Sequence, residues 1–397
     1  MRTWFYDIAR EDLRPLLERA GLEAYRAKQL WSWVYQHGEI ETARMTTFNA
    51  KTRAKIDEII DFTLPEVRED HVSLDGTRKW LVRFAERVGQ RAPGGEVETV
   101  FIPESSRGTA CLSSQVACSL RCSFCHTGAM SKAGLRNLSS GEIVAQLFQQ
   151  RLSYADFPSS SVDRLVSNIV MMGMGEPLLN YRNVKGALRT IMDGDGLSIS
   201  KRRITVSTSG VVPVIKKLGD ELDVNLAVSL HAVNDELRDV LVPLNKQYPM
   251  AELLRACREY PGATNCRKVT FEYVMLRGVN DSEAEARELI RLLKGIPALV
   301  NLIPVRSAHF FYRALTISAQ FNPWPGAPYE CSSIEQIRAF AAALEGAPDI
   351  RCTIRWPRGR DIMAACGQLA SSRQADDSAK AADDGAADRA PRQADAL

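Results

Sequence analysis

Three cysteines in one short loop are the side chains of this sequence best placed to do chemistry. Cys118, Cys122 and Cys125 stand in the run ACSLRCSFCHTG with the spacing CxxxCxxC, so one loop supplies three thiolates and no fourth. A structural zinc site takes four protein ligands, whereas a 4Fe-4S cluster held by three thiolates leaves one iron open to a small molecule. The spacing therefore favours a catalytic iron-sulfur centre.

Two other interpretations of the triplet stay open on spacing alone. Zinc would fit if Cys111 or His126 supplied a fourth ligand, and three loop cysteines can also be unrelated thiols. A disulfide framework is less favoured, because the chain has only nine cysteines in 397 residues and its start, MRTWFYDIAR, does not resemble a signal peptide. We therefore expect a reducing, cytoplasmic environment.

Composition is that of a large folded enzyme. Hydrophobic residues make up 45% of the chain and charged residues 25%, and no stretch approaches the ~18 consecutive apolar residues of a membrane helix. We expect a protein that does not enter a membrane. The formal net charge of +3 permits nucleic-acid binding without requiring it.

The elements that must position the cysteines alternate between strands and helices. The runs VSNIVMMG, RITVSTSG, VNLAVSLHA, VTFEYVML and LVNLIPV are short, apolar and rich in β-branched residues, as in strands buried on both faces. Repeated strand-helix units predict a parallel sheet, rolled fully or partly into a barrel. In such folds the loops that follow the strands carry the chemistry.

Two of the intervening helices have start signals. Ser139 with Glu142, and Ser282 with Glu285, match the capping-box spacing. Gly295 follows the second helix where a left-handed cap would lie. These signals predict helices beginning at about 140 and 283.

The loops after the predicted strands carry glycines and polar groups. One strand ends in GMGEP, residues 173–177, whose glycines allow close backbone approach and whose Glu176 can accept hydrogen bonds from an ammonium group. The next two strands end near Ser207 and at Ser229 to His231. Alone, GMGEP could be only a tight turn. Downstream of CxxxCxxC, these groups indicate the pocket of a cluster-bound ligand.

The two ends of the chain differ. LRPLLERAGLEAYRAKQLWSWVYQHG predicts two helices that end before Gly38, followed by the strand-like runs HVSLDGTRKWLVRF and EVETVFIP. The basic residues of this N-terminal segment form either a solvated face or a contact with a phosphate backbone. The Ala/Asp-rich residues 371–397 are expected to be disordered.

Together these motifs resemble a known superfamily. CxxxCxxC followed by GMGEP and strand-helix repeats is similar to the radical S-adenosylmethionine (SAM) enzymes, in which the open iron of the cluster chelates SAM. The segments CLSSQVACSLRCSFC, NIVMMGMGEPLLN, KRRITVSTSGVVP, SLHAVNDELRD, FNPWPGAPY and DIMAACGQLA further resemble the RlmN family, adenine carbon-2 methyltransferases of 23S rRNA and tRNA. The resemblance runs to about Ala370.

The resemblance implies an α/β fold and a division of the chain. The fold would be a partial (βα)6 TIM-like barrel of the radical SAM type with a small N-terminal helical accessory domain that contacts RNA. The expected boundaries are 1–60 for that domain, 61–106 for a β extension carrying Glu98, 107–370 for the barrel and 371–397 for the tail.

The resemblance also implies residue roles and two SAM molecules per turnover. Cys118, Cys122 and Cys125 would hold the 4Fe-4S cluster. Cys366 would take a methyl group from the first SAM. The 5′-deoxyadenosyl radical from the second SAM would remove a hydrogen atom from that methyl group, and the resulting S-methylene radical would add to the adenine. SAM would be bound by Gly175, Glu176, Ser207, Ser229, Leu230, His231 and Asn322.

Two further residues would complete the reaction. Glu98 matches the family's proton acceptor, and Cys111 matches the cysteine that resolves the protein-RNA adduct through a transient disulfide with Cys366. Without the resemblance, both cysteines would be called buried thiols and Glu98 a strand-surface carboxylate. RNA contact is expected from basic side chains around the pocket: Lys132, Arg136, Lys201, Arg202 and Arg203.

The implied partners are 23S rRNA, tRNAs methylated at adenosine 37, and a low-potential electron donor such as flavodoxin; we expect a monomer. One departure from the family is the insertion of Val305 to Gln320, just before Asn322. Two rivals remain. One is a carbon-8 adenosine rRNA methyltransferase of the antibiotic-resistance type, and the other is a non-catalytic, metal-stabilised RNA-binding protein.

Overall fold

The computed structural model describes residues 2–86, 94–130, 134–159, 164–264, 266–304 and 327–369. Four expectations fall outside the described residues: Lys132, Asn322, the insertion from Val305 to Gln320, and the tail at 371–397. Within the described residues, no helix has both the length and the apolar character needed to cross a membrane.

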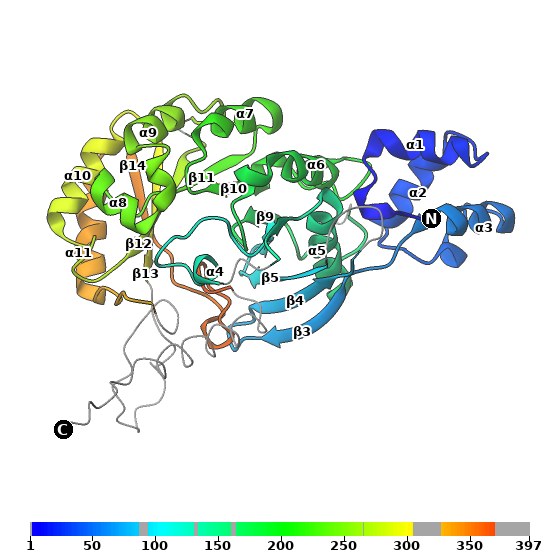
Figure 1. Ribbon diagram of the computed structural model, residues 1–397, viewed down its shortest axis with the longest axis horizontal. Helices are drawn as coiled ribbons and strands as arrows, with labels where there is room; N and C mark the ends of the chain where they lie inside the picture. Colours follow the sequence, from blue (N-terminus) through cyan, green and yellow to red (C-terminus); the bar gives the residue numbers. More distant parts are fainter. Residues whose placement is uncertain are drawn as a thin grey trace, which may run out of the picture.

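The N-terminal segment folds into short elements at one end of the molecule (Figure 1). The two helices expected from the sequence are present, and Gly38 follows them with a φ of +73°. Asp7 ties this segment to the rest, because its Oδ1 accepts a hydrogen bond from the backbone N–H of Gly141 at 2.7 Å. The elements are β1 (Thr3–Trp4), η1 (Phe5–Asp7), α1 (Arg10–Arg19), α2 (Arg26–Tyr35), η2 (Thr42–Arg44), α3 (Ala50–Ile59) and β2 (Ile60–Asp61).

One large sheet organises the remainder of the described chain. Its ten strands lie in the order β14-β13-β12-β11-β10-β9-β6-β5-β4-β3. Neighbours from β6 to β14 are parallel, whereas β3, β4 and β5 extend the sheet in antiparallel fashion. The strands are β3 (Glu66–Val72), β4 (Arg78–Phe84), β5 (Gly95–Pro103), β6 (Gly108–Cys111), β9 (Asn168–Met171), β10 (Ile204–Thr208), β11 (Asn225–Ser229), β12 (Val269–Met275), β13 (Ala298–Pro304) and β14 (Ile350–Ile354).

Helices connect the parallel strands and cover the outer face of the curved sheet (Figure 1). The expected α/β partial barrel is therefore confirmed, with β14 as an additional parallel strand. The covering helices are α5 (Ser140–Ser153), α6 (Tyr181–Met192), α7 (Val212–Leu222), α9 (Met250–Arg258), α10 (Glu283–Leu293) and α11 (Ile334–Glu345).

The predicted helix-capping residues form the expected hydrogen bonds at the starts of α5 and α10. Ser139 and Ser282 each accept a hydrogen bond from the backbone N–H of the glutamate three residues later, and each glutamate side chain accepts one in return from the N-cap backbone. Both capping boxes thus satisfy N–H groups that a helix start leaves unpaired. Gly295, just after α10, has a φ of +78°, the left-handed conformation expected there.

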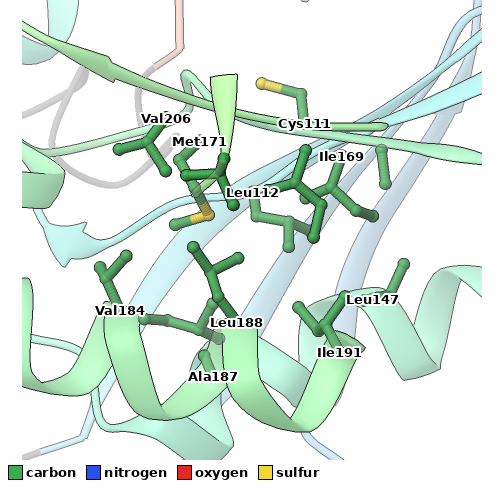
Figure 2. Packing of buried hydrophobic residues seen from close by; sticks show 14 of the residues in the cluster. Cys111, Leu112, Leu147, Ile169, Met171, Val184, Ala187, Leu188, Ile191 and Val206 are labelled. Atoms are coloured by element: carbon green, nitrogen blue, oxygen red, sulfur yellow. The ribbon is translucent and has the colours of Figure 1, made fainter. Parts of the chain in front are cut away.

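The two faces of the strands differ in polarity. Figure 2 shows Ile169 and Met171 of β9 packed on Leu188 of α6, while the Cys111 side chain points away from this apolar layer. The inner face of the sheet lines a cavity of about 670 Å³. Eight of the strand residues that line it are polar: Thr109, Asn168, Thr205, Asn225, Thr270, Glu272, Asn301 and Thr353. Because an apolar core would not be lined this way, the inside of the barrel is suited to a polar ligand.

Candidate active site

The cysteine triplet lies where the first parallel strand gives way to the short helix α4 (His126–Ala129). Cys118, Cys122 and Cys125 line a second cavity, of about 150 Å³. Burial raises the pKa of Cys122, and the neighbouring Cys125 and Cys118 raise it further. The three thiols therefore face a common space and interact electrostatically.

This donor set fits a cluster better than a single metal ion. Among the described residues, no three His, Cys, Asp or Glu side chains are close enough together to hold one ion as placed. A zinc ion would draw its thiolates to ~2.3 Å from one centre, whereas in a 4Fe-4S cluster each thiolate binds a different iron. His126 does not line the cavity of the triplet, and its Nδ1 lies 3.3 Å from the carbonyl oxygen of Gln368.

The GMGEP loop forms another wall of the smaller cavity. Gly175 has a φ of +97°, and a Cβ there would lie 2.6 Å from Cβ of Gln115, so only glycine fits. The next residue, Glu176, is buried, and burial raises its pKa. Its two carboxylate oxygens accept hydrogen bonds from the backbone N–H groups of Leu178 at 3.0 Å and Ser209 at 2.8 Å. The loop therefore holds a carboxylate in a fixed direction at the cavity wall.

The ends of β10 and β11 complete this cavity with Ser207, Ser229 and His231. His231 adopts a left-handed φ of +62°, and its Nδ1 accepts the backbone N–H of Val274 at 3.1 Å, which leaves the proton on Nε2. Burial lowers the pKa of His231 to about 3, with a further contribution from Arg238, so the ring is neutral. Leu230 does not line the cavity, because its side chain is fully buried in the core.

Arg238 was not identified from the sequence. It is fully buried on α8 (Asp235–Leu241) and donates hydrogen bonds to the carbonyl oxygens of Ser209, Ser229 and Leu230. Its guanidinium thus binds the loops after two neighbouring strands to each other. The only sequence signal for Arg238 was a basic residue within SLHAVNDELRD. Sequence alone does not distinguish a buried arginine on a helix from a solvent-exposed one.

The two cavities join beside Cys366. They share the wall residues Met172, Glu272, Ile303, Arg355, Cys366 and Leu369. Cys366 is exposed, whereas Cys111 is 5% exposed and lines the larger cavity from β6. The pKa of Cys111 is raised to about 12, mainly by burial and also by the Cys366 sulfur, while the Arg355 guanidinium opposes both. The structure therefore places the two predicted thiols on one cavity.

All nine cysteines lie within the described residues, and all are free thiols. The transient disulfide expected between Cys111 and Cys366 is therefore not present in this structure. Cys111 lies on the buried strand β6 and Cys366 on an exposed turn, and their sulfurs are not at bonding distance.

We call residues 357–369, which carry Cys366, the C-terminal strap. Its last residues are bound to the loop of the cysteine triplet and the start of α4, since the backbone N–H of His126 and the hydroxyl of Thr127 donate to carbonyl oxygens of the strap. Its first half is bound to the turn between β3 and β4: Asp361 accepts hydrogen bonds from Ser73 Oγ at 2.5 Å and from the backbone N–H of Leu74 at 3.1 Å. The segment that carries Cys366 is therefore hydrogen-bonded on one side to the turn between β3 and β4 and on the other to the end of the cysteine loop.

Glu98 lies near this site without lining either cavity. In the register of the sheet Val100 is opposite Cys111, so Glu98, two residues earlier on β5, shares the inner face with Cys111. Its carboxylate forms a buried ion pair of 2.8 Å with Lys79 Nζ, which also donates to the carbonyl oxygen of Met363 in the strap at 3.4 Å. Glu98 is thus buried rather than on the strand surface.

The predicted RNA-contacting cations divide into two groups. Arg202 and Arg203 are exposed and line the larger cavity at the amino end of β10. Arg136 is instead paired with Glu142, at 2.7 and 2.8 Å. Lys201 is paired with Asp223 at 2.6 Å.

Comparison with known proteins agrees with this geometry. The radical SAM superfamily matches residues 112–290, and the ribosomal RNA large subunit methyltransferase N-terminal domain matches residues 5–61. The chain is 52% identical to the dual-specificity RNA methyltransferase RlmN of Chelativorans sp. (strain BNC1), over 92% of this chain and 88% of that protein. It is also 52% identical to the protein of the same name from Rhodospirillum rubrum, over 92% and 79%.

A solved structure gives the same result. The crystal structure of a radical SAM methyltransferase from Sphaerobacter thermophilus superimposes with a TM-score of 0.79 at 42% identity, covering 92% of this chain and 99% of that one. Membership of the superfamily implies a 4Fe-4S cluster and SAM as cofactors. The chain therefore belongs to the RlmN family of RNA methyltransferases within the radical SAM superfamily.

Proposed function

We propose that this protein methylates carbon 2 of an adenosine in 23S rRNA and of adenosine 37 in tRNAs. The observation that carries the proposal is that Cys111 and Cys366 line one cavity, which opens beside Cys366 into the cavity of the cysteine triplet. Carbon 2 lies between two ring nitrogens and is electron-poor, so it does not attack a methyl donor as an amine would. A methyl group bound to a protein thiol beside a radical source can be converted to a carbon radical, which can add to this electron-poor carbon.

The triplet Cys118, Cys122 and Cys125 would hold the 4Fe-4S cluster, and SAM would occupy the smaller cavity. When bound, these cofactors supply a methyl group and a radical that removes a hydrogen atom. The proposed SAM contacts are Gly175, Glu176, Ser207, Ser229, Leu230, His231 and Asn322; Leu230 can contribute only backbone atoms, and Asn322 lies outside the described residues. Glu176, an acceptor held by two N–H groups, suits the SAM ammonium.

Cys366 would carry the methyl group. The thiol lies on the wall shared by both cavities, so its sulfur can receive the group from the SAM side and present it to the base. Carbon 2 of adenine would then become joined to Cys366 through a methylene bridge. The base would come from a single-stranded loop, because an adenosine there can be splayed out without breaking a stable helix.

Two residues would resolve this adduct. Glu98 would accept the proton that carbon 2 loses, with Lys79 holding the carboxylate at 2.8 Å. Because Glu98 lines neither cavity as placed, the proton transfer would require a small approach of the base or an intervening water. Cys111, which lines the same cavity, would act on the Cys366 sulfur and free the methylated base.

Mass spectrometry of nucleosides tests the proposal. Total RNA or an anticodon stem-loop is incubated anaerobically with reconstituted enzyme, SAM and reduced flavodoxin, then digested to nucleosides. We expect 2-methyladenosine. Formation of 8-methyladenosine would identify the carbon-8 rival, and the absence of any methylated product with cluster-loaded enzyme would favour a non-catalytic RNA-binding protein.

A further inference from the structure

The junction between the two cavities contains a buried acid that the proposed mechanism does not use. Glu272 of β12 is 5% exposed and lines both cavities. Within the described part of the chain its Oε2 atom has no hydrogen-bond partner. A buried carboxylate oxygen without a donor is costly, so such an atom in a cavity wall points to a ligand that donates a hydrogen bond.

The direction of this oxygen is fixed by its neighbours. Asn301 on β13 lies opposite Glu272 in the sheet and donates from Nδ2 to Glu272 Oε1 at 3.1 Å. The amide is fixed in turn by Thr353 on β14, whose hydroxyl donates to Asn301 Oδ1 at 2.5 Å. Three adjacent strands therefore orient one acid, and among the described residues its second oxygen stays without a donor in the wall between the two cavities.

A donor lies beside this acceptor. Arg355 Nη1 is 3.8 Å from Glu272 Oε1, and Arg355 shares the junction with Glu272 and Cys366. A guanidinium has five N–H groups, so Arg355 can serve a ligand as well as the carboxylate. Arg355 is near both neighbours, because Cys366 and Glu272 each raise the pKa of its guanidinium. The wall therefore offers a ligand an acceptor at Glu272, a thiol at Cys366 and a donor at Arg355, which is near both.

An adenine base has the complementary order along one edge. Its N6 amino group donates, its N1 accepts, and carbon 2 follows N1. We propose that Glu272 Oε2 accepts a hydrogen bond from the N6 amino group of the target adenine and that Arg355 donates to N1. This pairing brings carbon 2 to Cys366. The identity of the base rests on the proposed function. A 6-oxopurine would place an acceptor against Glu272 and a donor against Arg355, so it is rejected.

Binding of modified RNAs tests the assignment independently of turnover. The probes are three anticodon stem-loops with adenosine, purine riboside or inosine at position 37, and the protein is the cluster-loaded enzyme with SAM. Wild-type enzyme should bind the adenosine RNA about 10- to 100-fold more tightly than the purine riboside RNA, which lacks only the amino group. Equal affinities for these two RNAs would overturn the proposal.

The Glu272→Gln substitution changes the hydrogen-bonding group on the protein, as the modified RNAs change it on the base. Since Asn301 keeps the Gln oxygen at the Oε1 position, the new amide N–H₂ would face the base. The ratio of inosine to adenosine affinity should then rise at least about tenfold, because the amide donates to O6. The control is Glu104→Gln: both Glu104 oxygens already pair with Arg107, at 2.7 and 3.2 Å, in the wall of the same cavity. It should leave the ratio unchanged.

A second readout separates base recognition from SAM binding. Methylation of the enzyme's own Cys366 by SAM needs no RNA and is measured as a mass shift of the protein. We expect Glu272→Gln to leave this step within about twofold of wild type, which also shows that the variant folds. If Glu272 instead bound SAM, the variant would slow self-methylation and leave the RNA affinity ratio unaltered, which would refute the proposal. Adenosine-selective binding without 2-methyladenosine would instead overturn the proposed function alone.

Discussion

The backbone N–H of His126 donates a hydrogen bond to the carbonyl oxygen of Gly367 at 2.7 Å. His126 is the residue after the last cysteine of the triplet, and Gly367 is the residue after Cys366. The loop proposed to hold the cluster and the strap that carries the proposed methyl carrier are therefore joined next to their reactive sulfurs, although they are far apart in the sequence. We expect this junction to set the distance between the radical source and the methyl group.

Thr127→Val tests the junction. The Thr127 hydroxyl donates to the Leu369 carbonyl oxygen at 2.6 Å, and valine has the same shape without the donor. Losing one buried hydrogen bond of about 1 kcal/mol should loosen the strap and lower the rate of RNA methylation about five- to tenfold. SAM cleavage should continue, so more 5′-deoxyadenosine should form per methylated base.

The matched control for this variant is Thr190→Val, a change at a buried threonine of α6 that lines neither cavity. It should keep the wild-type ratio of 5′-deoxyadenosine to product. An unchanged ratio in Thr127→Val as well would mean that the hydrogen bond does not position Cys366.

Cys366→Ala should abolish RNA methylation while the cluster still assembles. The residue lines the junction of the cavities but is not part of the CxxxCxxC loop, so iron content and the visible absorbance of the cluster should stay at the wild-type level. The control is Cys352→Ala, a half-buried thiol on β14 that lines neither cavity. Any methylated adenosine above background from Cys366→Ala would rule out the methyl-carrier role.

Cys111→Ala should trap the protein-RNA adduct. The variant keeps Cys366, so the methylene bridge can form, but the cavity no longer has a second thiol to release it. A denaturing gel should show a band of enzyme joined to RNA, which nuclease digestion reduces to a mass increment on the peptide that contains Cys366. The double variant Cys111→Ala/Cys366→Ala should form no such band. Full release of methylated RNA by the single variant would contradict the resolving role.

Local signals in the sequence predicted local structure well. The capping residue Ser139, the left-handed Gly295 and the strand-like apolar runs all depend on neighbours within a few positions. The gathering of Ser207, Ser229 and His231 with the cysteine triplet also follows from the sequence, because the carboxyl ends of parallel strands meet at one edge of the sheet.

Long-range pairing could not be predicted in this way. Nothing near Asp361 indicates that its partner is Ser73, 288 residues earlier, yet this contact helps to place Cys366. The antiparallel strands β3 to β5 join the main sheet through a register that only the folded chain defines. Glu272 did leave a sequence signal, a single acid within the apolar run VTFEYVML, but its free oxygen becomes evident only in the assembled cavity.

The alkaline limit of stability should depend on Cys257, a fully buried thiol on α9 away from both cavities. Burial raises the pKa of Cys257 from 9.0 to about 12, which nearby Arg238 partly opposes. Below pH 9 the thiol is protonated in both the folded and the unfolded chain. Above pH 9 only the unfolded chain loses the proton, so the free energy of unfolding falls, by about 1.4 kcal/mol per pH unit up to the folded-state pKa.

Cys257→Ala removes this contribution. At pH 7 to 8 the variant should be less stable than wild type by about 1 kcal/mol, because a small cavity replaces the sulfur. The difference should shrink as the pH rises above 9 and should change sign within about one pH unit, when measured by denaturant unfolding of the apo protein under reducing conditions. Leu253→Val, on the same helix, also leaves a cavity but removes no titrating group. Its deficit relative to wild type should stay constant with pH, and a similarly constant deficit for Cys257→Ala would show that the buried thiol does not govern the alkaline loss of stability.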